Sequence, residues 1–369
     1  SLFAGLGLLC RSVHRGIKAA GVNVKQRFAN EYAEMPFEAN VGGNEIWDDC
    51  FDDALAMHGD IYTIDMNMIP KLDVLVMGSP CPAFSSANTQ RKKEGKVDIF
   101  HEESGTIFQP MLQAISTANP AVVILENSKF FKGSIFDYIM TDVMKRFGYL
   151  QTEVVLTGQE FGAFEKRERL CRVWYSKGLP ALDLTTFGGD VINPRIVADI
   201  LEPMSDEDER WRRRKYLEAK DAQAHNGHKY CIVNDTDLKM PTISASYHKI
   251  QPDSPMIAHP HKEGHTRILT PSEHCNVRYV EGDLKRQVTM IAEGSHPAQK
   301  GNRTSVSTAH RMLGNSVTVE TWEAVGARLG DWLKSLVTPA LQPVKTQTVE
   351  FDCAANESRH QPELQLSLI

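Results

Sequence analysis

Apolar segments of strand length alternate with helical patterns through the first half of the chain, and this alternation constrains the fold more than any other feature. Alternation of this kind is typical of an α/β domain with a doubly wound, mostly parallel sheet. In such sheets, ligands bind at the carboxyl ends of the strands. The strands are expected near residues 22–28, 74–77, 121–125, 149–157 and 170–175, and the helices near residues 12–20, 107–118 and 135–147.

The rhythm is lost after about residue 180, where Pro, Gly and Asp become frequent. A charged helix over residues 205–224 and a short strand over residues 241–247 are expected in this region, which predicts a second, smaller domain. After Asn315, apolar residues again recur at the spacing of an amphipathic helix. We therefore expect a larger domain over residues 1–179 that is completed by residues 305–337, an inserted domain over residues 180–304, and a flexible tail over residues 338–369.

Charge and cysteine usage narrow the class of protein. The seven cysteines among 369 residues are dispersed, without a CxxC pair, which argues for reduced thiols and against a structural zinc site; we expect no metal. No apolar stretch is long enough for a membrane helix, so we expect a cytoplasmic monomer without a membrane partner. With a net charge of −6, any contact with a polyanion must come from local basic patches.

Cys81 lies on the turn that follows the apolar residues 74–77, within the run Ser-Pro-Cys-Pro-Ala-Phe-Ser of residues 79–85. The two flanking prolines restrict the backbone on both sides of the thiol. An inert, buried thiol is the simpler interpretation, because free cysteines are among the most buried residues. A nucleophile is the alternative, and the position at a strand end favours it.

The turn Phe3-Ala-Gly-Leu-Gly7 could hold a nucleotide-like cofactor. Gly5 and Gly7 let backbone N–H groups approach a ligand closely, although such turns are also common without any ligand. Glu31 follows the next expected strand, where a carboxylate can accept hydrogen bonds from ribose hydroxyls.

Three further residues extend this candidate cofactor site. Tyr32 and Ile61 could enclose an adenine ring, and Asp60 could accept a hydrogen bond from its exocyclic amine. Each of these residues alone could instead be an ordinary surface or core residue. Their shared position at successive strand ends favours the cofactor.

Glu126 directly follows the apolar strand of residues 121–125, so burial should raise the pKa of its carboxyl group. A raised pKa suits donation of a proton or hydrogen bond near neutral pH. Arg167 and Arg169 alternate along the chain and could point the same way, one toward a substrate carbonyl and the other toward Glu126. A capping or ion-paired Glu126 and a solvated charge run at 166–169 are the alternatives.

Taken in order, the motifs of this chain resemble those of the DNA (cytosine-5) methyltransferase family. Six blocks carry the resemblance, which spans residues 1 to about 335. They are Phe3-Ala-Gly-Leu-Gly7, Pro80-Cys81, Glu126-Asn127-Ser128, Glu165-Lys-Arg-Glu-Arg169, Arg267-Ile-Leu-Thr-Pro-Ser-Glu273 and Gly314-Asn-Ser-Val317.

The resemblance implies a Rossmann-like catalytic domain that binds S-adenosylmethionine, with Pro80, Asn315 and Val317 joining the cofactor residues named above. It implies that Cys81 attacks C6 of a cytosine as a thiolate, which the site should favour. Glu126 would then engage N3 and the exocyclic amine of the base, and Arg167 would hold O2. Because C5 is out of reach inside a duplex, the cytosine must be flipped out.

The resemblance also implies double-stranded DNA as the partner and assigns the inserted domain to target recognition. A loop over residues 86–101 would close over the flipped base. The basic residues near Arg212 could contact DNA phosphates. The alternative is that they belong to an exposed helix, where the acidic residues at 206–209 balance their charge. The candidate DNA contacts are Ser85, Arg91, Lys92, Lys93, Arg212, Arg213, Thr242 and Tyr247.

The chain departs from the family pattern at several positions. Ser1 stands where the first block usually has an acidic residue, and Glu165 replaces the Gln of the QxRxR block. Where the family has Arg-Leu-Gln after the block that ends at Glu273, this chain has Asn276-Val-Arg278. We expect the last two of these changes to affect DNA-backbone or hinge contacts more than the chemistry.

The last five residues, Gln365-Leu-Ser-Leu-Ile369, resemble the short peptide that docks on the bacterial sliding clamp. Short apolar peptides on polar linkers can bind preformed pockets. A frayed terminus that binds nothing is the alternative.

Two other functions compete with DNA methylation. The first is methylation of cytosine in tRNA by a relative of the same family; the long stretch between Arg169 and Arg267 favours DNA. The second is a DNA-binding relative without activity, against which the presence of Cys81 together with Glu126 argues.

Overall fold

The computed structural model describes residues 1–32, 55–84, 98–101, 105–186, 195–222, 230–251, 253–297 and 305–337. The strands are β1 (Phe28–Glu31), β2 (Leu55–His58), β3 (Val74–Gly78), β4 (Val122–Asn127), β5 (Tyr149–Thr157), β6 (Glu168–Ser176), β7 (Arg212–Arg213), β8 (Ile232–Val233), β9 (Met256–Ala258) and β10 (His265–Arg267). The helices are α1 (Leu8–Ala19), α4 (Phe108–Ala118), α5 (Ile135–Arg146), α6 (Lys215–Ala222), α7 (Pro271–Val277), α8 (Gly282–Glu293), α9 (Val306–Asn315) and α10 (Val319–Val337).

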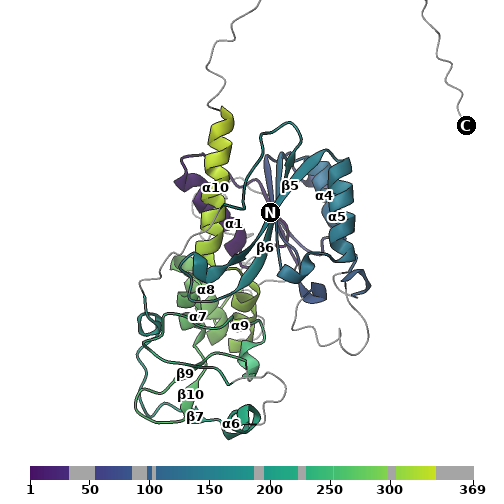
Figure 1. Cartoon of the computed structure of the whole chain (residues 1–369). Coiled ribbons are helices and arrows are strands. Elements are labelled where there is room, and N and C mark those ends of the chain that lie inside the picture. The colour runs from purple at the N-terminus through teal and green to yellow at the C-terminus, as the bar shows by residue number, and fades with distance from the viewer. Residues whose placement is uncertain are drawn as a thin grey trace, which may run out of the picture.

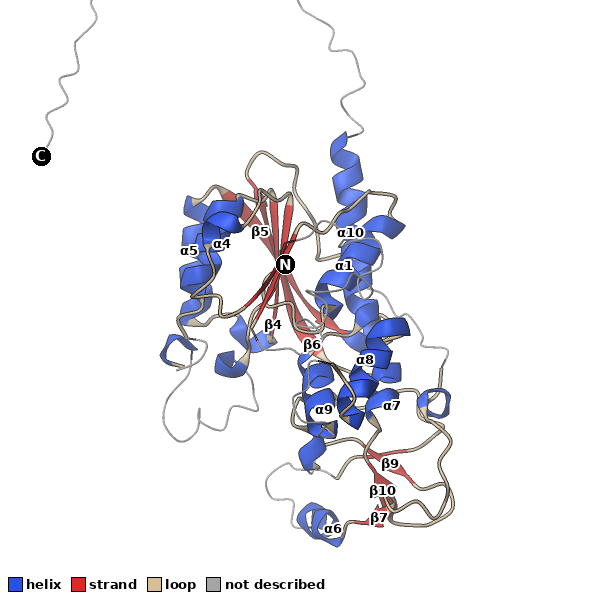
Figure 2. Ribbon diagram, turned by 180° about the vertical axis from the view of Figure 1, so that it is seen from behind, coloured by secondary structure: helices blue, strands red, loops and turns tan. Residues whose placement is uncertain are grey.

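The larger lobe is a sheet between two helical layers, with α1 and α10 on one face and α4 and α5 on the other (Figure 1). The smaller lobe holds β7, β9, β10 and α6, and helices α7, α8 and α9 lie between it and the sheet (Figure 2). The doubly wound α/β fold class expected from the sequence is therefore confirmed.

The large sheet runs in the order β2, β1, Leu2, β3, β4, β6 and β5. Leu2 forms parallel bridges to Asn30 on one side and Met77 on the other, so it joins β1 to β3. Only β6 among these described strands runs against its neighbours, pairing antiparallel with both β4 and β5. The carboxyl ends of β1, β3 and β4 therefore lie along one edge of the sheet.

The centre of the sheet is buried on both faces. Every residue of β4 is buried, and its side chains alternate between the two helical layers. Val122 and Ile124 pack with α1 and α10, whereas Val123 and Leu125 pack with α4 and α5. Burial of each such side chain stabilises the fold by about 1.5–3 kcal/mol. An unbroken apolar run is what a strand covered on both faces requires.

Helices α1 and α10 approach each other so closely that glycines are needed at the crossing. A Cβ atom on Gly16 would lie 2.0 Å from the carbonyl oxygen of Glu323, and one on Gly326 would lie 2.2 Å from that of Val13. These two contacts lie between backbones, so rotation of a side chain could not relieve the overlap.

The smaller lobe has its own core, which contains Tyr247, Ile257 and Leu269. Cys275 and the apolar residues between 280 and 292, in contrast, pack in the same cluster as β4, α1 and α10. We therefore propose a smaller recognition unit, residues 195–270, than the 180–304 expected from the sequence. No helix in the described ranges is long and apolar enough to cross a membrane.

Four expected elements differ from the structure, two of them in the larger lobe. The strand expected at 22–28 is β1, which begins only at Phe28; residues before it are held against α1 by bonds such as Cys10 Sγ to Gln26 Oε1, 3.0 Å. The helix expected near residue 12 begins at Leu8.

The other two differences lie in the smaller lobe. The charged helix expected over residues 205–224 is only α6, Lys215–Ala222, because Asp208 accepts the N–H of Arg210 and holds a turn ahead of it. Residues 241–247 form no strand. The N–H of Ile243 bonds to the side chain of Glu165 instead of to a neighbouring strand.

Candidate functional site

Strand register brings Cys81 and Glu126 to the same edge of the sheet. Gly78, at the end of β3, lies opposite Glu126 of β4, and the chain turns after Gly78 toward Cys81. Asn127 Nδ2 donates to Ser79 Oγ at 2.8 Å and fixes the start of this turn. Phe84, at its far end, packs edge-to-face on Phe131. The turn that carries the thiol is therefore anchored at both ends.

Glu126 is 9% exposed and forms an ion pair with Arg169, with 2.9 Å between Oε1 and Nε. Burial raises the pKa of the Glu126 carboxyl group, although the guanidinium groups of Arg169 and Arg167 oppose the shift. The expected direction of the shift is therefore confirmed. A carboxyl group with a raised pKa can donate a hydrogen bond near neutral pH.

The two arginines lie in different environments. Arg169 is partly exposed beside Glu126. Arg167 is only 4% exposed, and its Nη2 donates to the carbonyl oxygen of Gly314 at 3.0 Å. Burial lowers the pKa of the Arg167 guanidinium, and the charges of Arg169 and Arg278 add to this effect. Arg169 is thus the better placed of the two to meet a bound molecule.

Cys81 is partly exposed and interacts with the same charges. Burial raises the pKa of its thiol, Arg169 and Arg167 lower it, and Glu126 raises it. Because burial outweighs the two cations, the expectation that the site favours the thiolate is wrong for the free protein. The two arginines remain the groups that can stabilise the anion.

The glycine turn at the candidate cofactor site has a left-handed backbone, with φ of 57° at Phe3, 55° at Gly5 and 78° at Gly7. The N–H of Gly5 donates to Oε2 of Glu31 at 2.7 Å, which connects the turn to the end of β1. A Cβ atom on Gly5 would meet no described atom within 4 Å, so space is open beside the turn.

The remaining cofactor candidates lie at strand ends or beyond them. Tyr32 is 65% exposed after β1, whereas Ile61 is buried after β2. Asp60 accepts the N–H of Tyr62 at 3.0 Å. Asn315, the last residue of α9, is exposed, and Val317 is buried in the cluster that contains Leu6 and Leu9. Pro80 is partly exposed.

These features fit S-adenosylmethionine. The open space beside Gly5 suits a ligand that must approach the backbone, and the carboxylate of Glu31 suits ribose hydroxyls. The exposed ring of Tyr32 offers a flat apolar surface for an adenine.

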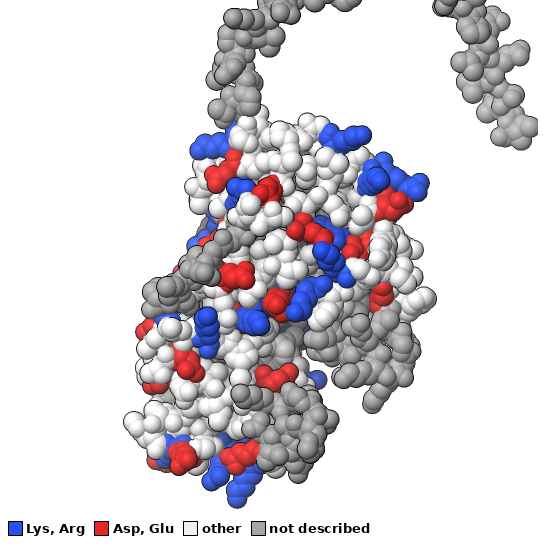
Figure 3. Space-filling model, viewed as in Figure 1, with Lys and Arg blue, Asp and Glu red and all other residues white. Residues whose placement is uncertain are grey.

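The candidate DNA contacts are only partly described. Arg212 and Arg213 are exposed, but Arg213 forms an ion pair with Glu218 at 3.2 Å and Arg212 donates to the carbonyl oxygen of Glu209. Thr242 is exposed. Figure 3 shows Lys and Arg side chains mixed with Asp and Glu over the face it presents, in keeping with the acidic overall charge. Ser85, Arg91, Lys92, Lys93 and residues 365–369 lie outside the described residues.

Tyr247 is completely buried, so its expected contact with DNA is wrong for this structure. Its hydroxyl group donates to the carbonyl oxygen of Pro255 at 2.7 Å and accepts the N–H of Leu269 at 2.9 Å. Its ring packs edge-to-face against His274 and His310. The residue therefore belongs to the core of the smaller lobe.

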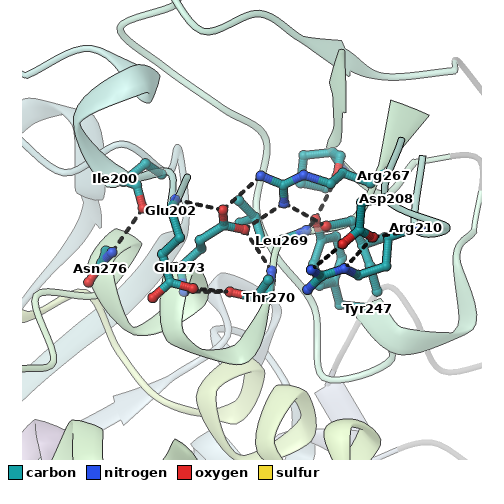
Figure 4. A network of polar contacts seen from close by, with 12 residues as sticks. Ile200, Glu202, Asp208, Arg210, Tyr247, Arg267, Leu269, Thr270, Glu273 and Asn276 are labelled. Atoms are coloured by element: carbon teal, nitrogen blue, oxygen red, sulfur yellow. Dashed lines mark hydrogen bonds and ion pairs between the residues drawn. The ribbon is translucent and has the colours of Figure 1, made fainter. Parts of the chain in front are cut away.

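A buried polar network supports the same lobe (Figure 4). Arg267, 2% exposed, forms two bonds to the carboxylate of Glu273, at 2.6 Å and 2.7 Å. Glu273 also accepts the N–H groups of Thr270 and Glu202, so it caps α7 and holds the chain near residue 202. In this protein, the Arg267–Glu273 block thus has a structural role: it connects α7 to the chain near residue 202.

Two contacts near the site were missed by sequence reasoning. Gly314 binds Arg167, and Arg278 binds Glu165. Residue type alone did not single out Gly314. Arg278 and Glu165 had a usable signal, because both are positions at which the chain departs from the family pattern.

Comparison with known proteins points to one family. The model of the C-5 cytosine-specific DNA methylase family matches residues 1–331. The Type II methyltransferase M.NlaX of Neisseria lactamica is 28% identical over 340 residues, which cover 89% of this chain and 94% of that protein. M.BsuFI of Bacillus subtilis is 29% identical over 310 residues, and the match covers 82% of this chain but 66% of that protein.

Solved structures share the fold at low sequence identity. The crystal structure of the Dnmt2 methyltransferase of S. pombe matches with a TM-score of 0.62 at 17% identity. The match covers 91% of this chain and 98% of the Dnmt2 chain. A putative DNA modification methyltransferase encoded within an E. coli prophage has a TM-score of 0.55 at 17% identity and covers 90% and 98%. The family match over 331 residues decides the relationship: this chain belongs to the C-5 cytosine-specific DNA methylase family.

Proposed function

We propose that the chain transfers a methyl group from S-adenosylmethionine to C5 of a cytosine in duplex DNA. The observation that carries the proposal is the cluster of Cys81, Glu126 and Arg169 at the edge of the sheet. Family membership supports the chemistry, and the relatives named as Type II methyltransferases support DNA as the substrate.

The Cys81 thiol loses its proton to solvent and the sulfur attacks C6 of the cytosine, so that the electrons of the C5–C6 double bond move toward C5 and into the ring. S-adenosylmethionine, when bound, supplies an electrophilic methyl group to C5. Solvent water then takes the proton from C5, the electrons of that C–H bond restore the C5–C6 double bond, and the Cys81 sulfur leaves C6 as a thiolate. Glu31, Tyr32 and Asp60 would hold the cofactor, together with the turn at Gly5.

Glu126 fits the Watson–Crick edge of cytosine. A protonated carboxyl group donates to N3 through its O–H and accepts from the exocyclic amine through its C=O. The raised pKa of Glu126 favours this form. Both bonds offset the charge that develops on the ring during attack.

We assign the contact with O2 to Arg169 in place of Arg167. Arg169 is the more exposed of the two and lies beside Glu126, whereas Arg167 is bound to Gly314. Because both cations lower the pKa of the Cys81 thiol, they also assist the attack. The target base must leave the duplex to reach these groups.

A methyl-transfer assay tests the proposal. Tritiated S-adenosylmethionine is supplied with duplex DNA or with tRNA, and with wild-type protein or Cys81→Ala. We expect label in DNA with the wild type alone, and a covalent complex with duplex DNA that contains 5-fluorocytosine. Label in tRNA alone would favour the RNA-modifying alternative, and label in neither would favour the inactive DNA-binding relative.

A further inference from the structure

The segment that leads into β6 presents three side chains in turn to the interior. Glu165, Arg167 and Arg169 face inward, whereas Lys166 is exposed and Glu168 pairs with Lys129 at the surface. This is the period of two that an extended backbone produces. Arg169 is held by Glu126 and Arg167 by Gly314.

Glu165 is held by Arg278, and both side chains are fully buried. Arg278 Nε lies 2.5 Å from Glu165 Oε2, and its Nη2 lies 3.1 Å from Oε1. One charge-assisted hydrogen bond, from Nη2 to Oε1, and a second close contact between the charged groups hold the carboxylate in place. A carboxylate in this pair cannot shift without leaving a buried charge unpaired.

The same pair binds two other parts of the chain. The N–H of Ile243 donates to Glu165 Oε1 at 2.7 Å, and Arg278 Nη2 donates to the carbonyl oxygen of Ile243 at 3.2 Å. Arg278 Nη1 donates to the carbonyl oxygen of Ser316 at 2.8 Å. The pair therefore joins the smaller lobe to residues 314–317 and to the strand that carries Arg169.

Arg167 makes a second link between the same segments. It reaches Gly314, where a Cβ atom would lie 2.5 Å from the backbone of Ala245. Three segments thus pack tightly around the ion pair, at residues 165–169, 240–245 and 314–316. A change at Glu165 or Arg278 must be transmitted to the arginines two and four residues beyond Glu165.

Glu165 and Arg278 are also two positions at which the sequence departs from the family pattern, which has Gln at each. The structure shows that the two departures are partners in one contact. A single charged replacement would leave a buried charge without a partner, whereas the paired replacement keeps the site neutral.

We infer that Glu165 and Arg278 form a positioning pair that aligns Arg167 and Arg169 with Glu126 and Cys81. This inference rests on the proposed methyltransferase function. Because both side chains are fully buried, the pair acts through the two arginines.

The test compares E165Q, R278Q and the double variant E165Q/R278Q with the wild type. Each protein is assayed for kcat and KM on duplex DNA and for its midpoint of thermal unfolding. Alkylation of Cys81 by iodoacetamide, followed by mass spectrometry, reports on the arginines without turnover, since both lower the pKa of the thiol. The matched control is E273Q, which breaks a different fully buried Arg–Glu pair, Arg267–Glu273.

We expect R278Q to lower kcat about 100-fold, as a displacement of about 1 Å can do, with KM changed less than about threefold. E165Q should lower kcat about tenfold, because glutamine keeps the acceptor for Ile243. The double variant should recover at least about tenfold of the loss in R278Q. Cys81 alkylation should slow in both single variants and recover in the double variant.

E273Q should lower the unfolding midpoint and leave kcat and Cys81 alkylation within about threefold of the wild type. If the single variants lower only the unfolding midpoint, or the double variant recovers nothing, the positioning role is refuted. If the wild type labels no nucleic acid, the proposed function fails, and the alkylation rates still decide whether the pair positions the arginines.

Discussion

Replacement of Arg169 by Ala tests the electrostatic design of the site most directly. The substitution removes the guanidinium that lies 2.9 Å from Glu126 and leaves that carboxyl group buried. The pKa of Glu126, already raised by burial, should rise further, and the pKa of the Cys81 thiol should rise with it. Fewer molecules would then hold the thiolate needed for attack.

Coulomb's law gives the order of magnitude. At an effective dielectric constant of about 20, unit charges about 4 Å apart interact by about 4 kcal/mol. Because the Arg169 side chain is 19% exposed, we take about 3 kcal/mol as the part lost in the transition state. That corresponds to a fall in kcat of about 100-fold.

The assay is single-turnover methyl transfer to duplex DNA at saturating cofactor, between pH 6 and 9. Arg167→Ala is the matched control, because it removes the same charge from a residue bound to Gly314. We expect that control to be destabilised by about 1–3 kcal/mol, since a buried carbonyl loses its donor, and to lose about tenfold less activity than Arg169→Ala. A larger loss in folded Arg167→Ala than in Arg169→Ala would refute the assignment.

Three further predictions concern buried carboxyl groups and close packing. Glu126→Gln should abolish methyl transfer yet raise the unfolding midpoint at pH 8 by about 2–4 °C. Because the pKa of Glu126 is higher in the folded state than in the unfolded state, the protein loses stability as the pH rises through the folded-state pKa, and glutamine removes that loss. A lower midpoint of the variant in calorimetry would contradict this. Burial raises the pKa of Glu320 to about 7 from 4.5. In urea titrations, the free energy of unfolding of the wild type should therefore fall by about 3 kcal/mol between pH 4 and 8, and that of Glu320→Gln should not. The same pH dependence in both proteins would refute the shift. Gly16→Ala should cost at least about 2 kcal/mol, because its Cβ would lie 2.0 Å from the Glu323 carbonyl oxygen, whereas Gly178→Ala, with open space around it, should change stability by less than about 0.5 kcal/mol in the same titration.

Sequence patterns predicted the centre of the large lobe well because burial there is nearly complete. β4 is covered on both faces, so its apolar run could end only where a polar residue reaches the sheet edge, at Glu126 and Asn127. The same logic predicted the turn that carries Cys81. The residues that lie at strand ends can be predicted from the local apolar pattern and from the order of strands and helices, and the sequence supplies both.

The smaller lobe was predicted poorly for a different reason. Its strands have two or three residues each, too short for a period to show. The role of Tyr247 depends on partners at Pro255 and Leu269, which no local pattern identifies. Arg278 and Glu165 lie 113 residues apart, so their pairing could be inferred only from two departures considered together.

The crossing of α1 and α10 has a consequence for synthesis on the ribosome. About 300 residues separate the end of α1 from the start of α10. At translation rates of about 5–20 residues per second, the apolar stripe of the first helix waits roughly 15–60 seconds for its partner. The nascent chain therefore has a long interval in which a chaperone can cover this stripe, and slowing translation should lengthen that dependence.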